Sequence, residues 1–274
     1  MYEFDRSTPV TVVLRAHGGH VEIVAEERLT IQVDVQPMDA GEGAADAAAK
    51  TRVELEDDTL LVQSPGADHW LWRRTPKLRI TVRVPAGSSL AAKSAAADIR
   101  ATGIYGTVRA DVASADVQVA EATGDVFLDA ASGDLTVALV GGGLRIKTSS
   151  GTLRIGDVTG DVNAETASGE IYAGDLHGSV KASSASGDIE IGTLRQGSAS
   201  LKTASGDVQV GVAPGAGVWM DLNTASGSSV SELTARGDEP PAGEPTKLEL
   251  RVRTASGDIR VVRAAAGAPR EAAA

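Results

Sequence analysis

A short phrase recurs along most of this chain at an almost constant interval: Ala-Ser-Gly-Asp, followed by an apolar, a polar and an apolar residue. Its glycine, or an alanine in its place, returns every 18 residues in the first six copies and then after 19, 21 and 30 residues. The nine positions are Ala97, Ala115, Gly133, Gly151, Gly169, Gly187, Gly206, Gly227 and Gly257. A fixed period of this kind is typical of solenoids, in which each repeat packs against its neighbours.

A weaker copy of the pattern falls nine residues after each early one, so each half of the repeat is predicted to be a turn and one short strand. Leu135, Val137 and Leu139 alternate with other residues, and we expect all three on one face. Residues 144–148 repeat this alternation. The Ser-Gly-Asp before each strand is turn chemistry, because Gly reaches φ values closed to other residues and Asp or Ser can accept nearby backbone amides.

The sequence has a nine-residue and an 18-residue period, and the stronger of the two indicates how the half-repeats are arranged in space. A second glycine, at Gly156, Gly174 and Gly192, follows the first by five residues and indicates a corner between two sides of a coil. Each repeat would then be one turn of a solenoid, stacked about 4.8 Å from the next. An antiparallel meander of nine-residue units would bury the same residues. We favour an all-β fold, a β-solenoid similar to a parallel β-helix with 18-residue coils, because the 18-residue identity is the stronger one.

The chain before the repeats also has the patterns of β-strands. The strands predicted there are 10–14, 21–24, 29–35, 52–55, 60–63 and 78–84. The sequence His17-Gly18-Gly19-His20 predicts a tight hairpin between the first two, because glycine supplies the positive φ that such turns need. Residues 44–50 alone are rich enough in alanine to predict a short helix.

Three parts are predicted along the chain. Residues 1–90 are expected to form a β-rich region that caps the solenoid, and residues 91–263 to form the solenoid itself. Residues 264–274, rich in Ala with Gly and Pro, are expected to be a disordered tail. A Pro-rich stretch at 239–245 predicts a loop before the last copy of the phrase.

Composition restricts the partners of the chain. Its net charge of −11 over 274 residues argues against nucleic acid, because that affinity rests on neutralising phosphates with Lys and Arg. Cysteine is absent, which excludes disulfides and thiolate metal sites. The sequence has neither a signal peptide nor a run of 18 apolar residues. We therefore expect a cytoplasmic chain that is not inserted in a membrane.

Calcium is the ligand that a nine-residue unit with Asp suggests first. Calcium-binding β-rolls use Gly-Gly-x-Gly-x-Asp, which arranges several oxygens around each ion, whereas here a single Asp follows a single Gly. At the position after the glycine, Thr152 and Ser228 interrupt the column of acids. A turn tolerates such interruptions and a row of ion sites does not, so we expect no calcium.

No other motif for chemistry is present. His17 and His20 are close in sequence, but glycines separate them and the chain has no Cys to complete a metal site. The nucleophile elbow, the phosphate-binding loop and the His-Glu-x-x-His motif are all missing. We expect no enzyme, no cofactor, and no catalytic, cofactor-binding or metal-binding residue.

Two of the three tryptophans lie together, in the segment Trp70-Leu71-Trp72-Arg73-Arg74. Their rings could cap the open N-terminal end of the solenoid, because a stacked core needs terminal caps. They could instead bind a partner, because Trp and Arg are frequent in interface hot spots. We name Trp70, Trp72, Arg73 and Arg74 as a capping or partner-binding patch and favour the cap.

The repeated Thr/Ala-Ser-Gly-Asp-Ile/Val and the segment Val84-Pro85-Ala86-Gly87-Ser88 that leads into the repeats resemble a known bacterial family. It is a β-strand-repeat domain of unknown function, labelled adhesin-like and akin to the head domains of predicted autotransporter adhesins. The resemblance covers residues 10–263. It implies a β-helix-like fold in a bacterial protein, sometimes associated with envelope-stress genes, and it defines no catalytic or ligand residues.

These observations predict a non-enzymatic scaffold or protein-interaction module, adhesin-like, with a protein partner or a second copy as its ligand and a link to envelope stress or self-assembly. One predicted outward row is too varied for a uniform repetitive ligand; it consists of Arg100, Gln118, Thr136, Arg154, Tyr172 and Glu190. The alternative is a carbohydrate-binding or carbohydrate-active β-helix protein. Glycan sites need aromatic platforms, and the repeats contain few aromatic residues: Tyr105, Phe127, Tyr172 and Trp219.

Overall fold

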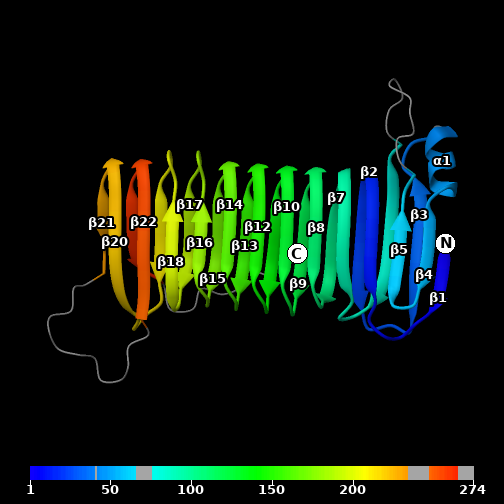
Figure 1. The fold of residues 1–274 in the computed structure, drawn as a ribbon, viewed down its shortest axis with the longest axis horizontal. Helices are drawn as coiled ribbons and strands as arrows, with labels where there is room; N and C mark the ends of the chain where they lie inside the picture. The colour runs from blue at the N-terminus through cyan, green and yellow to red at the C-terminus, as the bar shows by residue number, and fades with distance from the viewer. Residues whose placement is uncertain (41, 66–75, 234–246, 265–274) are drawn as a thin grey trace.

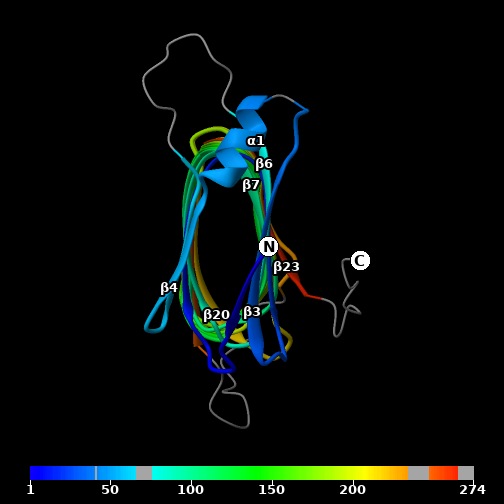
Figure 2. The same cartoon turned by 90° about the vertical axis from the view of Figure 1, so that its right-hand side faces the viewer.

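The computed structural model describes residues 1–40, 42–65, 76–233 and 247–264. Each 18-residue repeat contributes one strand to each of two facing sheets, which together form a flattened tube (Figures 1 and 2). Equivalent strands of neighbouring coils pair in parallel, as where Leu128 lies between Ala110 and Ile146. The predicted all-β solenoid with 18-residue coils is confirmed, and the antiparallel meander is excluded.

The strands of the first sheet, in their order along the tube, are β4 (Arg52–Glu56), β5 (Thr59–Gln63), the first half of β2 (Thr11–Glu26), the first half of β7 (Ser89–Tyr105), β8 (Val108–Ser114), β10 (Val126–Ser132), β12 (Leu144–Ser150), β14 (Val162–Ser168), β16 (Val180–Ser183), β18 (Gly197–Lys202), β22 (Lys247–Ser256) and β20 (Gly217–Ser226). All of these neighbours pair in parallel except β4 and β5, which are antiparallel.

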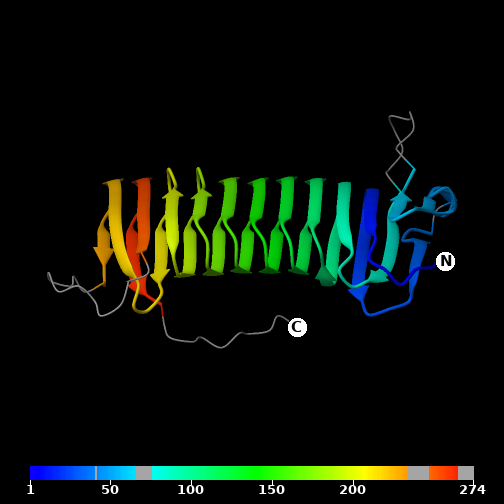
Figure 3. The same cartoon turned by 60° about the horizontal axis from the view of Figure 1, so that its bottom comes forward.

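The strands of the second sheet, in the same direction, are β1 (Tyr2–Asp5), β3 (Thr30–Pro37), β6 (Leu78–Pro85), the second halves of β2 and β7, β9 (Val117–Ala122), β11 (Leu135–Val140), β13 (Leu153–Val158), β15 (Ile171–Leu176), β17 (Ile189–Leu194), β19 (Val208–Val212), β23 (Ile259–Arg263) and β21 (Ser229–Ser231). Figure 3 shows the tube with its bottom turned toward the viewer. Strands β2 and β7 pair with each other in both sheets.

Inward side chains of both sheets form one apolar core inside the tube. Leu135, Val137, Leu144 and Ile146 are all buried, as predicted. The prediction for Leu139 is wrong, because this side chain is 37% exposed and Val140 points inward in its place. The alternation breaks after Val137, where two successive residues face outward at the bend that the sequence predicted as a corner.

At both ends of the tube, the order of the coils in space differs from their order in the sequence. Strand β2 lies between β6 and β7, although β6 follows it by some fifty residues (Figure 1). At the other end, the coil made by β22 and β23 lies between the coil of β18 and β19 and the coil of β20 and β21. The outermost repeat-like coil at the C-terminal end of the tube is therefore residues 217–231.

The predicted hairpin at residues 17–20 is wrong. Strand β2 runs without interruption through these residues and pairs in parallel with β7 on both sides of them, from Thr11 to Ala16 and from Gly18 to Ala25. Gly19 does adopt a positive φ of 114°, but the reason is close approach: a Cβ on Gly19 would lie 2.0 Å from the backbone oxygen of Leu78. The glycine lets the strand pass from the first sheet to the second while β6 lies against it.

The N-terminal end of the tube is closed by elements that do not repeat. Strands β3 and β4 pair antiparallel with β6 and β5, and β1 continues this arrangement beyond β3. Helix α1 (Glu42–Ala49), at the position predicted for a helix, packs against β3 and β6 through the buried residues Ala44 and Ala47. Trp70 and Trp72, predicted as a cap, lie outside the described residues, as do residues 239–245 and all but the first residue of the predicted tail.

The Asp of the repeated phrase holds neighbouring coils together. The Oδ1 atom of Asp116 accepts the backbone amide of Asp134 at 2.8 Å, and Asp134 accepts that of Thr152 at 2.8 Å. The predicted role in accepting amides is confirmed, but the amide belongs to the next coil and not to the same turn. Ser228, which interrupts the column of acids in the sequence, ends it in space, where its amide donates to Asp258 at 2.8 Å.

The Thr that often precedes the phrase has an internal role. Thr203, which is buried, donates from Oγ1 to the backbone oxygen of Gly187 in the preceding coil at 3.2 Å. Thr254 donates in the same way to Gly206 at 3.3 Å. These hydroxyl groups satisfy carbonyl oxygens at the edge of the core, which would otherwise be costly to bury.

Candidate functional site

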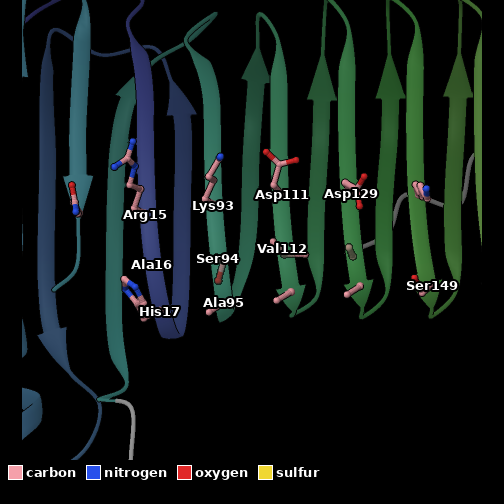
Figure 4. Close-up of a pocket in the computed structure, with 15 residues that line it drawn as sticks. Arg15, Ala16, His17, Lys93, Ser94, Ala95, Asp111, Val112, Asp129 and Ser149 are labelled. Carbon is pink, nitrogen blue, oxygen red and sulfur yellow. The ribbon is translucent and has the colours of Figure 1, made fainter. Parts of the chain in front are cut away.

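A groove of about 910 Å³ runs across the outer surface of the first sheet, from β2 to β12 (Figure 4). Its floor consists of small side chains, among them Ala95, Ala113 and Ala131. Four strand spacings of about 4.8 Å give it a length of roughly 19 Å. These alanines lie at the end of each strand, next to a corner, and their short side chains leave room above the sheet. The groove therefore results directly from the repeated Ala-Ser-Gly phrase.

A single row of charged side chains borders this floor. Strand pairing places Arg15 beside Lys93, Lys93 beside Asp111, Asp111 beside Asp129, and Asp129 beside Lys147. Figure 4 shows the first four of them in line above the alanines. Like charges are therefore adjacent twice, two cations followed by two carboxylates, an arrangement that opposes folding where such residues lie directly opposite each other.

Most charges of this row have no ion partner among the residues that the structure describes. Asp111 lies 3.5 Å from Nε of Arg109. Arg15, Lys93, Asp129 and Lys147 make no ion pair with any residue that the structure describes. Arg15 and Lys93 are like charges in adjacent strands, whereas Lys147 lies between Asp129 and Glu165. Exposed charges without an ion partner are available to groups from another molecule.

A second row beside the first adds an aromatic ring. Phe127, on β10, is 42% exposed. It lies in register between Arg109 on β8 and Arg145 on β12, the two strands that flank β10. A hollow of about 340 Å³ opens beside it. An exposed ring flanked by two guanidinium groups is the composition that protein interfaces favour at their centres.

The first sheet is more basic than the chain as a whole. Its outward cations from β2 to β20 are Arg15, Lys93, Arg109, Arg145, Lys147, Lys181, Lys202, Arg251 and Arg253. Its outward acids over the same strands are Asp111, Asp129, Glu165, Asp221 and Glu249. A chain with a net charge of −11 thus presents one face on which cations outnumber acids.

The second sheet is a different surface. Its outward residues include Tyr172, whose hydroxyl donates to Glu170 at 2.8 Å; this hydrogen bond raises the pKa of the phenol. Arg154 pairs with Asp134 at 3.1 Å. Strand pairing confirms that Arg154, Tyr172 and Glu190 share one outward row, as predicted. Arg154 and Tyr172 thus have partners within the molecule, in contrast to most charged residues of the groove.

One Ser–His contact lies at the end of the groove. Ser64 Oγ is 3.1 Å from Nδ1 of His17, but Ser64 is buried and no carboxylate of the described residues orients the imidazole. The contact therefore attaches the end of β5 to β2 and lacks the accessible nucleophile and oriented base of a catalytic site. Among the described residues, no group of three or more His, Asp or Glu side chains could hold a metal ion.

The predicted patch of Trp70, Trp72, Arg73 and Arg74 lies outside the described residues. The groove was missed by sequence reasoning, although a signal existed: its charged residues from 93 to 147 follow one another at intervals of 18. Arg15 could not be found in this way, because its place in the row depends on the insertion of β2 between β6 and β7. Of the exposed aromatic side chains among the described residues, Phe127 and Trp219 lie on the first sheet and Tyr2 and Tyr172 on the second, so these four form no common platform for a glycan.

The features described so far are the repeated parallel coils, the closed N-terminal end and the Asp contacts between coils. A family model matches the part of the chain that contains the coils. The model is that of Toastrack, DUF4097, and it matches residues 11–262. The chain belongs to the Toastrack family. The resemblance read from the repeated phrase is thereby confirmed. No curated protein matches this Toastrack sequence.

Solved structures similar to this Toastrack chain include a candidate adhesin from Bacteroides fragilis, 15% identical, with a TM-score of 0.51 over 95% of each chain. This similarity shows the fold alone. A candidate cell adhesion protein from Clostridium sporogenes has 9% identity and a TM-score of 0.22 over 94% of each chain. A candidate lipid-binding protein from Parabacteroides distasonis has 12% identity and a TM-score of 0.37 over 96% of each chain. In the described part of this Toastrack chain, no helix is long and apolar enough to span a membrane.

Proposed function

We propose that this chain is a non-enzymatic scaffold that binds a protein partner along the groove of the first sheet. The observation that carries the proposal is the row of charges from Arg15 to Lys147 over a floor of alanines, in which only Asp111 has an ion partner among the described residues. The stacked coils hold this row rigid, because each strand is paired on both sides. A preorganised surface costs little conformational entropy when a partner binds.

The charge order defines the chemistry of the partner. Acidic side chains would face Arg15 and Lys93 at one end and Lys147 at the other, and basic side chains would face Asp111 and Asp129 in the middle. A uniform polyanion such as nucleic acid would meet two carboxylates at the centre of the groove. The adjacent Phe127 would supply the apolar contact that protein interfaces use.

The Bacteroides fragilis protein is described as a candidate adhesin, which is also a binding function. A cytoplasmic location, which the sequence leads us to expect, would make the partner a soluble protein or the inner side of an envelope complex. The proposal itself depends on the groove and not on the compartment.

A photo-crosslinking residue, benzoylphenylalanine, tests this proposal when it replaces Phe127 in cells of the source organism. We expect a discrete protein adduct. The adduct should disappear in the variant Lys93→Glu/Lys147→Glu and persist in Lys181→Glu/Lys202→Glu, which changes the net charge equally on the same sheet outside the groove. The same crosslinker at Tyr172 reports the second sheet and should give no such adduct.

The proposal is wrong if Phe127 gives no protein adduct, or if the adduct survives the charge reversal at Lys93 and Lys147. A glycan array tests the alternative class. Clear binding of a polysaccharide by the purified chain would favour the carbohydrate-binding alternative over a protein scaffold.

A further inference from the structure

The coil at the C-terminal end of the tube pairs on one side only. Among the described residues, β20 pairs with β22 and has no strand on its other side, and β21 likewise pairs with β23 alone (Figure 1). Every coil from β8 and β9 onward to β22 and β23 has neighbours on both sides. Within the part of the chain that the structure describes, the last coil therefore presents two free strand edges, one from each sheet.

The register shows which amides face outward at this end. In earlier coils the first inward residue of each first-sheet strand donates its N–H to the following coil, as Val126 does to Gly143 at 2.9 Å and Val162 to Ser179 at 2.8 Å. Met220 occupies the equivalent position in β20, opposite Leu250, and Val218 and Leu222 lie two residues to either side of it. Because strand residues alternate, the backbone amides of Val218, Met220 and Leu222 point toward the free side.

The same three residues leave the core incompletely covered. Val218, Met220 and Leu222 are each only half-buried, whereas their partners on β22 are at most 2% exposed. Strand β20 is ten residues long, contains no Lys and no Pro, and has one charged residue, Asp221, which pairs with Arg253. Edge strands of natural proteins are usually shortened, charged or interrupted by Pro, and a long apolar edge without these features is a site for pairing with another strand.

The opposite end of the tube is closed. Helix α1 and the antiparallel strands β1, β3 and β4 occupy it, so a parallel head-to-tail stack of copies has no free parallel edge to join. A two-fold axis at the C-terminal end would instead bring two free edges together. Symmetric, self-complementary contacts of this kind are the commonest form of protein oligomer.

Charges at the end do not oppose such a contact. Asp221 lies 3.9 Å from Arg253, and Glu232 is 3.1 Å from Nε of Arg260. The end coil thus carries neutralised pairs, although the whole chain has a net charge of −11. On β21 the inward positions are Ser229 and Ser231 opposite Ile259 and Val261, so the apolar part of the end is on β20.

We propose that a second copy of this chain docks on this end, tail to tail, with β20 of one copy antiparallel to β20 of the other. A single foreign strand could extend one sheet only. The same end of a second copy offers both strands at the matching separation, and it would cover Val218, Met220 and Leu222 of each copy. This surface is separate from the groove of the first sheet, and the dimer does not depend on the function proposed for that groove.

Analytical ultracentrifugation and hydrogen exchange of the intact chain test the proposal together. We expect a monomer–dimer equilibrium across the micromolar range. Amides of residues 217–226 should exchange more slowly as the dimer forms, whereas those of 247–256, already paired on both sides, should not change. Added salt should strengthen the dimer, because it screens the net negative charge of the two copies.

The variant Met220→Lys places a charge at the free edge and should give a monomer, with Gln118→Lys, on the outside of the second sheet, as the control for the added charge. Circular dichroism shows whether Met220→Lys folds; if it does not, the exchange data on the unaltered chain decide. The variant Lys93→Glu/Lys147→Glu should still dimerise, which separates this proposal from the function of the groove.

Three results would overturn the dimer: a monomer at every concentration, a dimer whose protection appears outside residues 217–231, or a folded Met220→Lys variant that still dimerises.

Discussion

The Oδ1 atom of Asp207 accepts the backbone amide of Asp258 at 2.7 Å, across 51 residues of sequence. Between Asp116 and Asp134 the equivalent contact spans 18 residues. The long span arises because β22 and β23 lie between the coil of β18 and β19 and the coil of β20 and β21. A carboxylate at this corner thus holds whichever coil lies next to it in space.

Removing that acceptor should weaken the attachment of the inserted coil. We expect Asp207→Ala to lower the free energy of unfolding by about 1 kcal/mol, as at other sites where a side-chain oxygen caps a free amide. Glu170 occupies the same register position but accepts no amide of the following coil among the described residues; its hydrogen bond is to Tyr172. Urea unfolding should therefore show a smaller loss for Glu170→Ala, and equal losses would contradict the assigned role.

The threonines that precede the repeated Ala-Ser-Gly phrase allow a test of hydrogen bonding, because Thr and Val side chains have the same shape. Thr203→Val removes the hydroxyl that donates to Gly187 and should cost about 1–2 kcal/mol, because the carbonyl oxygen loses its partner. The Oγ1 atom of Thr166, at the equivalent position, is buried and has no partner in the described structure. Thr166→Val should be neutral or stabilising in the same thermal and urea melts. The reverse order of the two variants would refute this difference.

The division between inside and outside can be tested at adjacent residues. Ile155 is 4% exposed, so Ile155→Asp should place a charge in the core and destabilise by about 3–5 kcal/mol. Arg154 faces solvent and pairs with Asp134, so Arg154→Asp should cost within about 1 kcal/mol. Guanidinium unfolding of both variants measures the contrast, and similar midpoints would show that the assignment of faces is wrong.

Low pH should reduce the stability that Asp258, the last carboxylate of the column, contributes to the fold. The amide and hydroxyl of Ser228 donate to Asp258 and lower the pKa of its carboxyl group. A lowered pKa in the folded state stabilises the fold at pH values above the ordinary Asp pKa, and this contribution is lost as pH falls through the folded value. The difference in melting temperature between the unaltered chain and Asp258→Asn should thus be constant near neutrality and shrink below about pH 4. A difference independent of pH would contradict this.

The sequence predicted the solenoid because its evidence is periodic. Each 18-residue repeat carries the same inward pattern, as at Leu144 and Ile146, and stacking places equivalent residues side by side. Leu139 was predicted inward because alternation was extended through a bend, and backbone direction at a bend cannot be read from apolar residues alone. The hairpin at residues 17–20 was predicted from two glycines, but the constraint on Gly19 is the backbone of Leu78, a residue far away in the sequence.

The candidate site was predictable only in part. Lys93, Asp111, Asp129 and Lys147 lie at intervals of 18 and could have been aligned from the sequence. The absence of ion partners for Lys93, Asp129 and Lys147 among the described residues, and the hollow beside them, could not be predicted, because both depend on the side chains that surround them. The site named from the sequence, with Trp70 and Trp72, stays a prediction.

By itself, the sequence determined the local unit of this protein: an 18-residue coil with two strands, inward apolar residues, a glycine turn and a carboxylate that accepts an amide. Those features depend on contacts between equivalent positions, so a repeat specifies them wherever it lies. Only the tertiary structure decided the order of the coils, with β2 inserted at one end and β22 at the other. Because all coils have parallel strands in the same register, any coil can pair with any other. The order of the coils therefore depends on which coil faces remain to be covered at each end of the tube.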